Sequence, residues 1–339
     1  MNKIVERDCL DIINSVDLRP LRKKKVLITG ASGLLGQYLV QSIYLANRLQ
    51  KLDCRLECVS LHGPGRSVKK LLPDRLISSR KMDLTDNFKL AGNYDFIFHA
   101  AGYGQPYKFI ADPFSAIAIN VFATYRLLNM AKKNKATFVY FSSGEVYGEI
   151  PKEMIPVPET YNGNYSTANL RAMYGESKRL GEAICFIFKR DFNVPLKILR
   201  IFHVYGPGMT INDPRVLGDF MRQALAHKPI MLKDAGKAVK TFSYISDVIK
   251  MILYVALRGK SEVYNIGGID SISIKDLAGT VGRYCGVPVK IPKGKHHLSH
   301  VGDEVLVIKP DLKKILNEMK KFSFTNFNQG IANTIEWNK

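Results

Sequence analysis

Hydrophobic positions in the first two hundred residues follow two alternating spacings. Short apolar runs rich in β-branched and aromatic residues recur at 26–29, 56–60, 96–99, 137–142 and 195–200, and each predicts a buried strand. Between these runs the apolar residues recur at helical spacing, from the first strand through Leu49 and across 113–133 and 170–189. Strands that alternate with helices are joined by right-handed crossovers, so the pattern predicts an α/β fold with a doubly wound parallel sheet.

Both ends of the chain depart from this alternation. Val5, Cys9, Ile12, Ile13 and Val16 lie at helical spacing, which predicts a short amphipathic helix on the outside of the domain. Beyond about residue 200 the alternation weakens and Gly and Pro become more frequent, which indicates a smaller lobe over the strand ends. We therefore expect a helical extension (1–24), a sheet domain (25–200 and 240–264) and a smaller lobe (201–239 and 265–339).

Composition excludes several classes of protein. The chain has 339 residues and a net charge of +20, but its only dense basic block, residues 22–25, leads into the first strand. Without a basic stripe interleaved with aromatics we predict no nucleic-acid partner, and the positive field favours a diphosphate instead. No apolar run approaches the roughly 20 residues that span a bilayer, so we expect no membrane contact and a cytoplasmic location.

Cysteine and histidine usage predicts neither disulfides nor a metal site. The five cysteines are odd in number and scattered, which is typical of reduced thiols in a cytoplasm. Neither they nor the seven histidines have the spacing of metal ligands.

A glycine-rich turn follows the first predicted strand. Gly30, Gly33 and Gly36 have the spacing Gly-x-x-Gly-x-x-Gly, and such glycines let a backbone approach a pyrophosphate at a helix N-terminus. The spacing differs from the Gly-x-Gly-x-x-Gly fingerprint, and alone it could be a plain strand-to-helix turn. Its position after the first strand of an alternating chain favours dinucleotide binding, with Ser32, Leu34 and Leu35 in the same site.

The end of the second predicted strand has no carboxylate to bind the adenosine ribose. Ser60 can bond a ribose hydroxyl there, and Arg66 is close enough in sequence to reach a 2′-phosphate. NAD is therefore the expected cofactor, with NADP left open. Asp83, followed by Leu84, could accept a hydrogen bond from the adenine amino group, although a helix N-cap explains this aspartate equally well.

Candidate catalytic residues lie in the middle of the chain. Tyr174 and Lys178 are four apart in a predicted helix, so they share one face and the ammonium can favour ionisation of the phenol. Ser143, at the end of a strand, could bond a sugar oxygen beside Tyr174 or serve only a turn. Glu145 could do acid-base work in a cofactor cleft or be a surface glutamate.

Taken with Phe98 to Gly102, Asn120 and residues 200–207, these motifs resemble the extended short-chain dehydrogenase/reductase family. The resemblance runs from about Lys25 to Lys321 and is to its NAD-dependent nucleotide-sugar epimerases and dehydratases, nearest to the UDP-glucuronate decarboxylases. It implies a Rossmann-type NAD-binding domain and a C-terminal substrate-binding lobe. It also implies a set of cofactor contacts, Ala100, Ala101 and Gly102 beside Tyr174 and Lys178, and a set of substrate contacts, Tyr103, Ser143, His203, Arg215 and Lys240.

The resemblance implies a shared chemistry. Tyr174, assisted by Ser143 and Lys178, takes the proton of the sugar 4-hydroxyl while hydride passes from carbon 4 to NAD. The resulting ketone acidifies the adjacent carbon, which permits dehydration, decarboxylation or reduction on the other face. The hydride then returns within the same enzyme, so no external oxidant is consumed.

Departures from the family pattern bear on the final step. Gly144 replaces the first member of the Asp-Glu pair that dehydratases use, and Ile308 replaces the arginine that decarboxylases place before Lys-Pro. His203 replaces an asparagine, and Lys240 replaces the arginine expected to bind the diphosphate. An unpaired carboxylate beside Ile308 would lose its hydration without a compensating charge, so we expect carbon-4 epimerisation of a neutral sugar rather than decarboxylation or 4,6-dehydration.

Two other classes of function remain open. A net NAD(P)-dependent dehydrogenase or reductase would suit the missing ribose carboxylate, because a loosely held cofactor exchanges. A non-catalytic NAD-binding regulator would have no use for Ser143, Tyr174 and Lys178 together. The helical segments 116–131 and 170–188 are apolar on more than one face, which predicts a homodimer.

Overall fold

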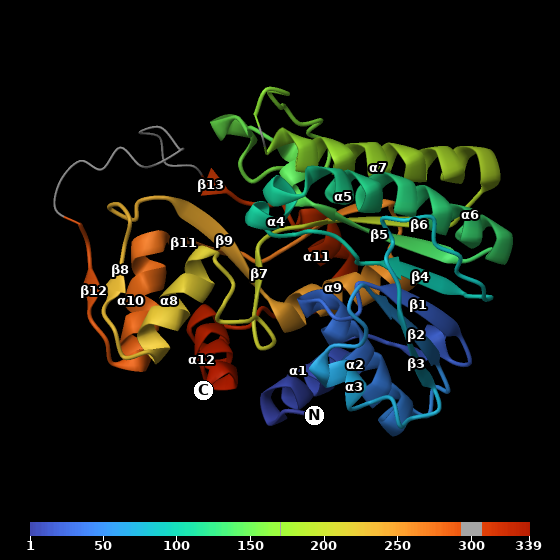
Figure 1. Cartoon of the computed structure of the whole chain (residues 1–339), viewed down its shortest axis with the longest axis horizontal. Coiled ribbons are helices and arrows are strands. Elements are labelled where there is room, and N and C mark those ends of the chain that lie inside the picture. Colours follow the sequence, from blue (N-terminus) through green and yellow to red (C-terminus); the bar gives the residue numbers. More distant parts are fainter. Residues whose placement is uncertain (170, 293–306) are drawn as a thin grey trace.

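Seven of the strands that the structure describes pair in parallel to form a central sheet (Figure 1). The structure is a computed structural model and describes residues 1–169, 171–292 and 307–339. In spatial order the strands are β3 (Ile77–Lys81), β2 (Arg55–Ser60), β1 (Lys25–Thr29), β4 (Phe96–His99), β5 (Thr137–Ser143), β6 (Leu196–Ile201) and β10 (Val263–Ile266). The predicted doubly wound parallel sheet is confirmed.

The order of the strands reverses next to β1. From β1 the chain winds outward to β2 and β3, returns to β4, and then winds the opposite way to β5, β6 and β10. Ile28 of β1 pairs with Phe98 of β4, so the loops after these two strands leave the sheet side by side. Doubly wound sheets bind their ligands at such a reversal, outside the carboxyl ends of the strands.

One face of the sheet is covered by the helices in the middle of the chain (Figure 1). They are α4 (Pro106–Ala111), α5 (Pro113–Ile117), α6 (Thr124–Asn134) and α7 (Ala172–Phe192). A π-helical turn, Ala118–Ala123, joins α5 to α6, so the helix predicted at 113–133 exists but is not regular. π turns often occur at functional sites. Leu170, the predicted first residue of the next helix, lies outside the described residues.

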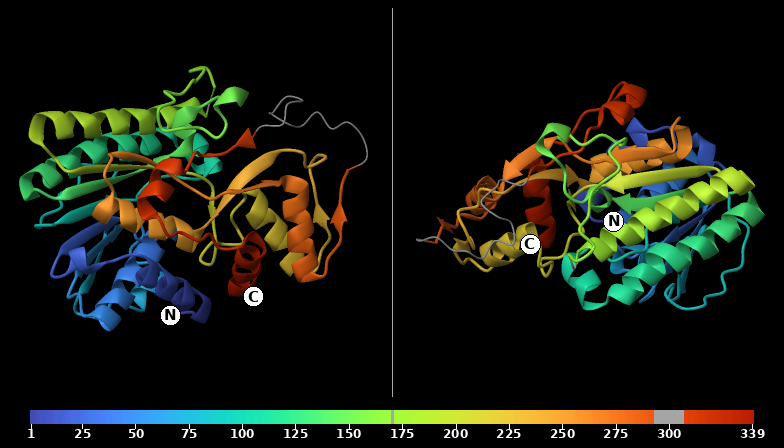
Figure 2. Two further views of the ribbon diagram at one scale, coloured as in Figure 1. Left: turned by 180° about the vertical axis from the view of Figure 1, so that it is seen from behind. Right: turned by 90° about the horizontal axis from the view of Figure 1, so that it is seen from above.

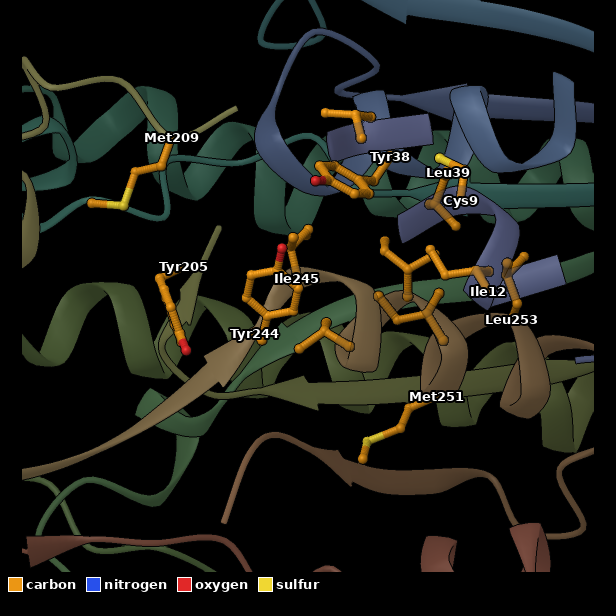
Figure 3. Packing of buried hydrophobic residues seen from close by; sticks show 14 of the residues in the cluster. Cys9, Ile12, Tyr38, Leu39, Tyr205, Met209, Tyr244, Ile245, Met251 and Leu253 are labelled. Carbon is orange, nitrogen blue, oxygen red and sulfur yellow. The ribbon is translucent and has the colours of Figure 1, made fainter. Parts of the chain in front are cut away.

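The opposite face carries the N-terminal helix. Here lie α1 (Lys3–Ser15), α2 (Leu34–Gln50), α3 (Arg66–Lys69), α9 (Ile245–Arg258) and α11 (Lys313–Met319), with a 3₁₀ turn at Arg19–Leu21. Cys9 and Ile12 of α1 pack near Leu39 of α2 and Leu253 of α9 (Figure 3). The amphipathic helix predicted at the N-terminus therefore exists and packs on the outside of the sheet domain.

The remaining elements gather at one end of the molecule (Figure 2). A small sheet joins β7 (Val204–Tyr205), β9 (Val239–Tyr244), β11 (Asp270–Ser273) and β13 (Val307–Ile308), and β8 (Ile230–Met231) pairs with β12 (Val289–Lys290). The helices of this lobe are α8 (Val216–Leu225), α10 (Ile274–Cys285) and α12 (Phe327–Asn338). Since β9 runs directly into α9, the lobe is continuous with the sheet domain.

Two short 3₁₀ turns, Gly144–Tyr147 and Lys152–Met154, follow β5 and bring the chain over the strand ends. Among the residues that the structure describes, no helix has the length and apolar character to cross a membrane.

Candidate active site

The glycine turn between β1 and α2 needs its glycines for steric reasons. Gly30 has a positive φ of 69°, and a Cβ on it would lie 2.6 Å from backbone atoms of Ala100 and Ala101. A Cβ on Gly36 would lie 2.3 Å from the carbonyl oxygen of Gly30. The turn therefore holds the N-terminus of α2 against the end of β4, and its backbone amides form a cradle suited to a pyrophosphate.

The adenosine side of this cradle is built by the end of β2. The Ser60 hydroxyl donates to the carbonyl of Gly63 at 2.7 Å, and its oxygen can still accept from a ribose hydroxyl. A Cβ on Gly65 would lie 3.5 Å from Ser32, so Arg66, the next residue, begins α3 beside the glycine turn. These positions fit the nucleotide end of a dinucleotide.

Asp83 lies in a turn rather than at a helix. Its Oδ1 accepts from the amide and the hydroxyl of Thr85 at 2.8 and 2.7 Å. Residues 82–95 contain no helix, so the alternative interpretation of Asp83 as an N-cap is wrong. The next residue, Leu84, is buried against Leu27 and Val59, under the strand ends.

The end of β4 is fixed by a buried histidine. The Nδ1 atom of His99 is 2.8 Å from the Thr29 hydroxyl, and its Nε2 is 3.3 Å from the carbonyl of Ile119 in the π turn. Burial lowers the pKa of His99 to about 3, so this ring is neutral. A neutral ring that donates from Nε2 and accepts at Nδ1 satisfies both contacts, and it ties the π turn to the strands that hold Ala100 to Gly102.

Strand β5 and helix α7 bring the predicted catalytic residues together. The Lys178 ammonium donates to the carbonyl of Phe141 at 2.7 Å. Two positions further along β5, the Ser143 side chain hydrogen-bonds to Tyr174. A Cβ on Gly102 would lie 3.6 Å from the Lys178 Nζ, so the end of β4 borders the same site.

The environment of Tyr174 opposes its ionisation. Its ring stacks on Phe109 at a centroid distance of 4.5 Å and also packs near Tyr103. Burial raises the pKa of Tyr174, the Glu145 carboxylate raises it further, and the Ser143 hydrogen bond lowers it. The sequence argument expected the neighbouring lysine to favour the phenolate, but Lys178 Nζ lies 6.0 Å from the ring centroid and burial outweighs it.

Lys178 is itself buried. Burial lowers its pKa to about 7, while Glu182 and Cys185 raise it. The ammonium packs over the Tyr140 ring at 4.9 Å. Whether Lys178 is protonated at neutral pH therefore depends on the few polar groups around its ammonium.

Glu145 is held by two residues of the loop before α7. Its Oε1 accepts from Arg171 at 3.0 Å, and Tyr165 donates to its main-chain carbonyl and, at 3.4 Å, to Oε2. The Glu145 side chain is 26% exposed. It is therefore partly buried and held in place, which favours the acid-base interpretation over a surface glutamate, and its role stays a prediction.

Cationic side chains gather near Glu145, Arg171 from the loop before α7 and Arg215 and Lys240 from the smaller lobe. Burial, with Lys240, Arg215 and Arg171 close by, lowers the pKa of His203 to about 3. Burial also lowers the pKa of Lys240, as do Arg171 and Arg215, whereas Glu145 raises it. We call Arg171, Arg215 and Lys240 the cation cluster; its charges could hold an anion such as a diphosphate.

Arg215 is positioned by an aspartate that sequence reasoning did not single out. Asp213 accepts from Arg215 at 2.7 and 3.0 Å and from the Gln105 amide at 2.8 Å, and it is 2% exposed. Gln105 lies just before α4, so this buried carboxylate links the smaller lobe to the sheet domain.

Two of the departures noted in the sequence meet in one apolar cluster. A Cβ on Gly144 would lie 2.9 Å from the ring of Phe202. Phe202, Val146, Tyr147 and Val157 form this cluster, and Ile308 packs against it. Ile308 also pairs with Lys240 across β13 and β9, so their side chains share one face of the small sheet.

The structure thus brings most of the predicted site residues to one edge of the sheet. Sequence reasoning missed Arg171 and Tyr165, because their partner Glu145 is distant in the chain. It also missed Asp213, whose contact with Gln105 joins segments far apart in the sequence. The spacing of two between Asp213 and Arg215 was an available signal. Among the described residues no cluster of His, Cys, Asp or Glu could hold a metal ion.

Comparison with known proteins identifies the family. The model of the NAD dependent epimerase/dehydratase family matches residues 26–267. UDP-glucuronic acid decarboxylase 3 of Arabidopsis thaliana is 28% identical over 302 residues, which cover 87% of this chain and 85% of that protein.

Two solved structures share the fold. UDP-glucuronic acid 4-epimerase from Bacillus cereus, solved with NAD, has a TM-score of 0.74 at 24% identity and covers 93% of this chain and 96% of its own. A dTDP-glucose 4,6-dehydratase from Streptomyces venezuelae, also solved with NAD, has a TM-score of 0.78 at 21% identity, with coverage of 92% and 96%. The chain therefore belongs to the NAD-dependent epimerase/dehydratase family, and it is a nucleotide-sugar enzyme of the extended short-chain dehydrogenase/reductase type.

Proposed function

We propose that the enzyme transiently oxidises a nucleotide sugar at carbon 4 and returns the hydride internally, with carbon-4 epimerisation as the net reaction. The observation that carries the proposal is the meeting of Ser143 with Tyr174, with Lys178 one helical turn further along α7. In this arrangement a phenol that can accept the 4-hydroxyl proton stands beside a serine that can hold the sugar oxygen. NAD supplies the reversible acceptor for the hydride.

The cofactor would lie along the ends of the sheet strands. Gly30, Gly33 and Gly36 would hold the pyrophosphate, and Ser60 and Asp83 the adenosine end. Lys178 would bond the nicotinamide ribose, since its ammonium borders the end of β4 at Gly102. The glycine turn follows β1 and Gly102 follows β4, the two strands at the reversal of the strand order, which supports this placement.

The smaller lobe would bind the substrate. Two members of the cation cluster, Arg215 and Lys240, would bind the diphosphate. Asp213 holds the Arg215 guanidinium in one orientation. His203 is neutral, so it can donate to or accept from a sugar or phosphate oxygen without adding charge. A neutral sugar then requires no further cation.

Apolar packing beside the sugar position supports epimerisation over 4,6-dehydration. Dehydration needs an acid at position 144, and Phe202 occupies the space in which that side chain would begin. Glu145 alone remains, held by Arg171. Without an acid to protonate the 6-hydroxyl, the ketone is returned to the alcohol, and reduction on the opposite face inverts carbon 4.

UDP-glucuronate decarboxylation is the second candidate. Ile308 cannot pair with a carboxylate, but Arg171 could, since its guanidinium is half exposed and already pairs with the carboxylate of Glu145. The similarity of the chain to UDP-glucuronic acid decarboxylases also supports decarboxylation. If the carboxylate of glucuronate displaced Glu145 from Arg171, the substrate would gain Arg171 as its charge partner. The same exchange would free Glu145 for acid-base work.

Product analysis with two substrates decides between the candidates. We expect UDP-glucose deuterated at carbon 4 to give UDP-galactose that retains the deuterium, with no net accumulation of NADH. UDP-glucuronate should release carbon dioxide slowly or not at all. Rapid, stoichiometric formation of UDP-xylose would reverse this ranking, and steady NADH accumulation would indicate a net dehydrogenase instead.

A substitution at Ile308 sharpens the same test. Ile308→Arg restores a guanidinium next to Lys240 and should raise decarboxylation of UDP-glucuronate at least about tenfold, because a buried carboxylate gains a charge partner. Ile308→Met keeps the site apolar at similar volume and should leave the rate unchanged. An equal effect of both variants would show that Ile308 does not contact the sugar.

We also propose that the enzyme is a homodimer and that it functions in the reducing cytoplasm. The outer surfaces of α5, the π turn, α6 and α7 expose a set of large apolar side chains: Phe114, Phe122, Tyr125, Leu180, Phe186 and Ile187. These helices lie side by side (Figure 1), so two copies could pair them into a four-helix bundle.

The state of the cysteines supports the proposed reducing environment. Four of the five thiols are buried, and burial raises the pKa of Cys9, Cys54 and Cys58 to about 12, which suits stable free thiols.

A further inference from the structure

A third residue continues the buried row of α7 that begins with Tyr174 and Lys178. Glu182 follows Lys178 by four positions, so the three side chains lie on one face of the helix. All three are buried, and Glu182 is 6% exposed. The proposed mechanism makes no use of this carboxylate, although a buried anion is costly unless it is paired.

Three consecutive residues of strand β5 contact the three side chains of this row. Ser143 bonds Tyr174, the carbonyl of Phe141 accepts from Lys178, and the Ser142 hydroxyl donates to Oε1 of Glu182 at 2.6 Å. Three consecutive residues of one strand therefore hold three successive turns of one helix.

Arg200 of β6 supplies the opposite charge to Glu182. Arg200 pairs with Ser142 in the sheet, so both side chains reach Glu182 from the same face. Its NH2 group donates to Oε2 at 2.7 Å and its Nε to Oε1 at 3.1 Å, which is a bidentate pair. Such a pair keeps the carboxylate ionised in a buried place.

Among the described residues, Glu182 is the only anionic group that faces Lys178. The other titratable groups that face it are Cys185 of α7, His99 of β4, and the phenols of Tyr140 and Tyr174. Burial raises the pKa of Cys185 and of both phenols, and it lowers that of His99, so these groups are neutral near pH 7. Glu182 is also the principal group that raises the pKa of Lys178 against burial.

We propose that Glu182 is the counter-charge that keeps Lys178 protonated in its buried site, and that Ser142 and Arg200 position it for this role. A neutral lysine would lose a donor and the charge that stabilises a developing phenolate on Tyr174. Glu182 is thus a positioning residue that acts through Lys178. The inference rests on the role of Lys178 in the proposed function.

The protonation of Lys178 can be measured without any substrate. Protein labelled with ¹³C at the lysine ε-carbons is titrated by NMR, and the Lys178 signal is assigned by its loss in Lys178→Arg. We expect the titration midpoint to fall by about one pH unit or more in Glu182→Gln. The midpoint should return toward that of the wild type in Glu182→Asp, which keeps the charge.

A matched control lies on the same helix. Glu176→Gln removes an equal charge from the exposed face of α7, where Glu176 pairs with Arg179, and it should leave the midpoint unchanged. If Glu182→Gln leaves Arg200 unpaired and fails to fold, the double variant Glu182→Gln with Arg200→Gln replaces the ion pair by a neutral pair. In that variant we expect a midpoint below that of Arg200→Gln alone, because the two proteins differ only in the charge at Glu182.

An unchanged midpoint in either folded variant would overturn the inference. That result would leave the proposed function standing, because the titration needs neither turnover nor a substrate. Where turnover is measurable, the alkaline limb of the pH profile of kcat/KM should move by the same amount as the NMR midpoint. A purely structural role of Glu182 would lower the rate without moving that limb.

Discussion

The surroundings of Tyr174 raise the pKa of its phenol, so the phenolate is not available as a base before the substrate reacts. Its burial and the Glu145 carboxylate both disfavour the phenolate, and only the Ser143 hydrogen bond among its immediate contacts favours it. Proton transfer to Tyr174 would therefore need a positive charge close enough to stabilise the phenolic oxygen as negative charge develops on it. Lys178 is the described cation nearest to supply that charge.

Replacing Tyr174 by Phe tests this assignment. The variant loses only the phenolic oxygen and keeps the ring that stacks on Phe109, so the fold and NAD affinity should be nearly unchanged. Turnover should fall by at least 10²–10⁴-fold, the usual worth of a positioned acid or base. NAD binding by fluorescence and turnover by product analysis separate the two effects. Near-normal activity would mean that another residue takes the proton.

Lys178→Ala serves as the contrast. It removes a group that is proposed to bond the nicotinamide ribose as well as to assist Tyr174, so it should weaken NAD binding and turnover together. If only turnover fell, the proposed ribose contact would be wrong.

At the residue scale, the candidate catalytic groups were easier to find in the sequence than the groups that hold them. Tyr174, Lys178 and Ser143 have recognisable spacing or lie at a strand end. Arg171 and Asp213 act on Glu145 and Arg215 through contacts that exist only after folding. Glu182 shows the same limit: its spacing from Lys178 is visible in the sequence, but its partner Arg200 comes from another strand.

At the element scale, the buried elements before residue 200 were predicted, whereas the polar edge strand β3 and the buried β10 and α9 beyond residue 200 were not. The strands β1, β2, β4, β5 and β6 are apolar runs, and the structure has all of them. The edge strand β3 reads Ile-Ser-Ser-Arg-Lys, so its sequence carries no apolar pattern and its pairing with β2 decides its structure. The π turn between α5 and α6 was missed because its side chains keep a helical spacing.

Gly36 offers a test of the turn between β1 and α2. In Gly36→Ala the new methyl group would meet the backbone of Gly30, which cannot move without disturbing the strand ends. NAD affinity should fall at least about tenfold, or the protein should lose several degrees of thermal stability. Gly279→Ala is the matched control, because a Cβ on this helical glycine of α10 has ordinary contact distances. Unchanged NAD binding and stability in Gly36→Ala would show that the turn is looser than described.

The helix α1 is joined to the rest of the protein through a carboxylate with a displaced pKa. Asp8 accepts from the Tyr38 and Tyr244 hydroxyls at 2.9 and 2.8 Å, and burial raises its pKa from 3.8 to about 6 (Figure 3 shows both tyrosines). A raised carboxyl pKa means that the folded state binds the proton more tightly than the unfolded state. The contribution of Asp8 to stability is therefore largest at low pH and falls as the pH rises through about 4 to 6.

Asp8→Asn resembles the protonated form at every pH and removes this dependence. The difference in unfolding free energy between variant and wild type should shift in favour of the variant by about 1 kcal/mol between pH 5 and pH 7.5. Urea unfolding at the two pH values measures it. Glu6→Gln, an exposed position on the same helix, should give no such shift, and a pH-independent difference for Asp8→Asn would contradict the assignment.

At the scale of the whole molecule, the site is assembled from both parts of the chain. The sheet domain provides the glycine turn and the row on α7, and the smaller lobe provides Arg215 and Lys240. The Asp213 carboxylate accepts from Gln105 of the sheet domain and from Arg215 of the lobe, so one buried group sets their spacing. The outer surface of α5 to α7 lies away from this junction, which leaves it available for a second copy.

The proposed dimer places this outer surface in contact with its equivalent on a partner. Phe122→Glu and Leu180→Glu put charges on side chains that are 57% and 51% exposed, so the isolated chain should tolerate both. In a dimer the same charges would be buried without partners, at a cost large enough to separate the copies at micromolar concentration. Light scattering should give twice the mass of the chain for the wild type and the single mass for the variants. Leu49→Glu, at an equally exposed position on α2, should remain dimeric. A monomeric wild type would refute the dimer. A dimeric Phe122→Glu would place its interface elsewhere.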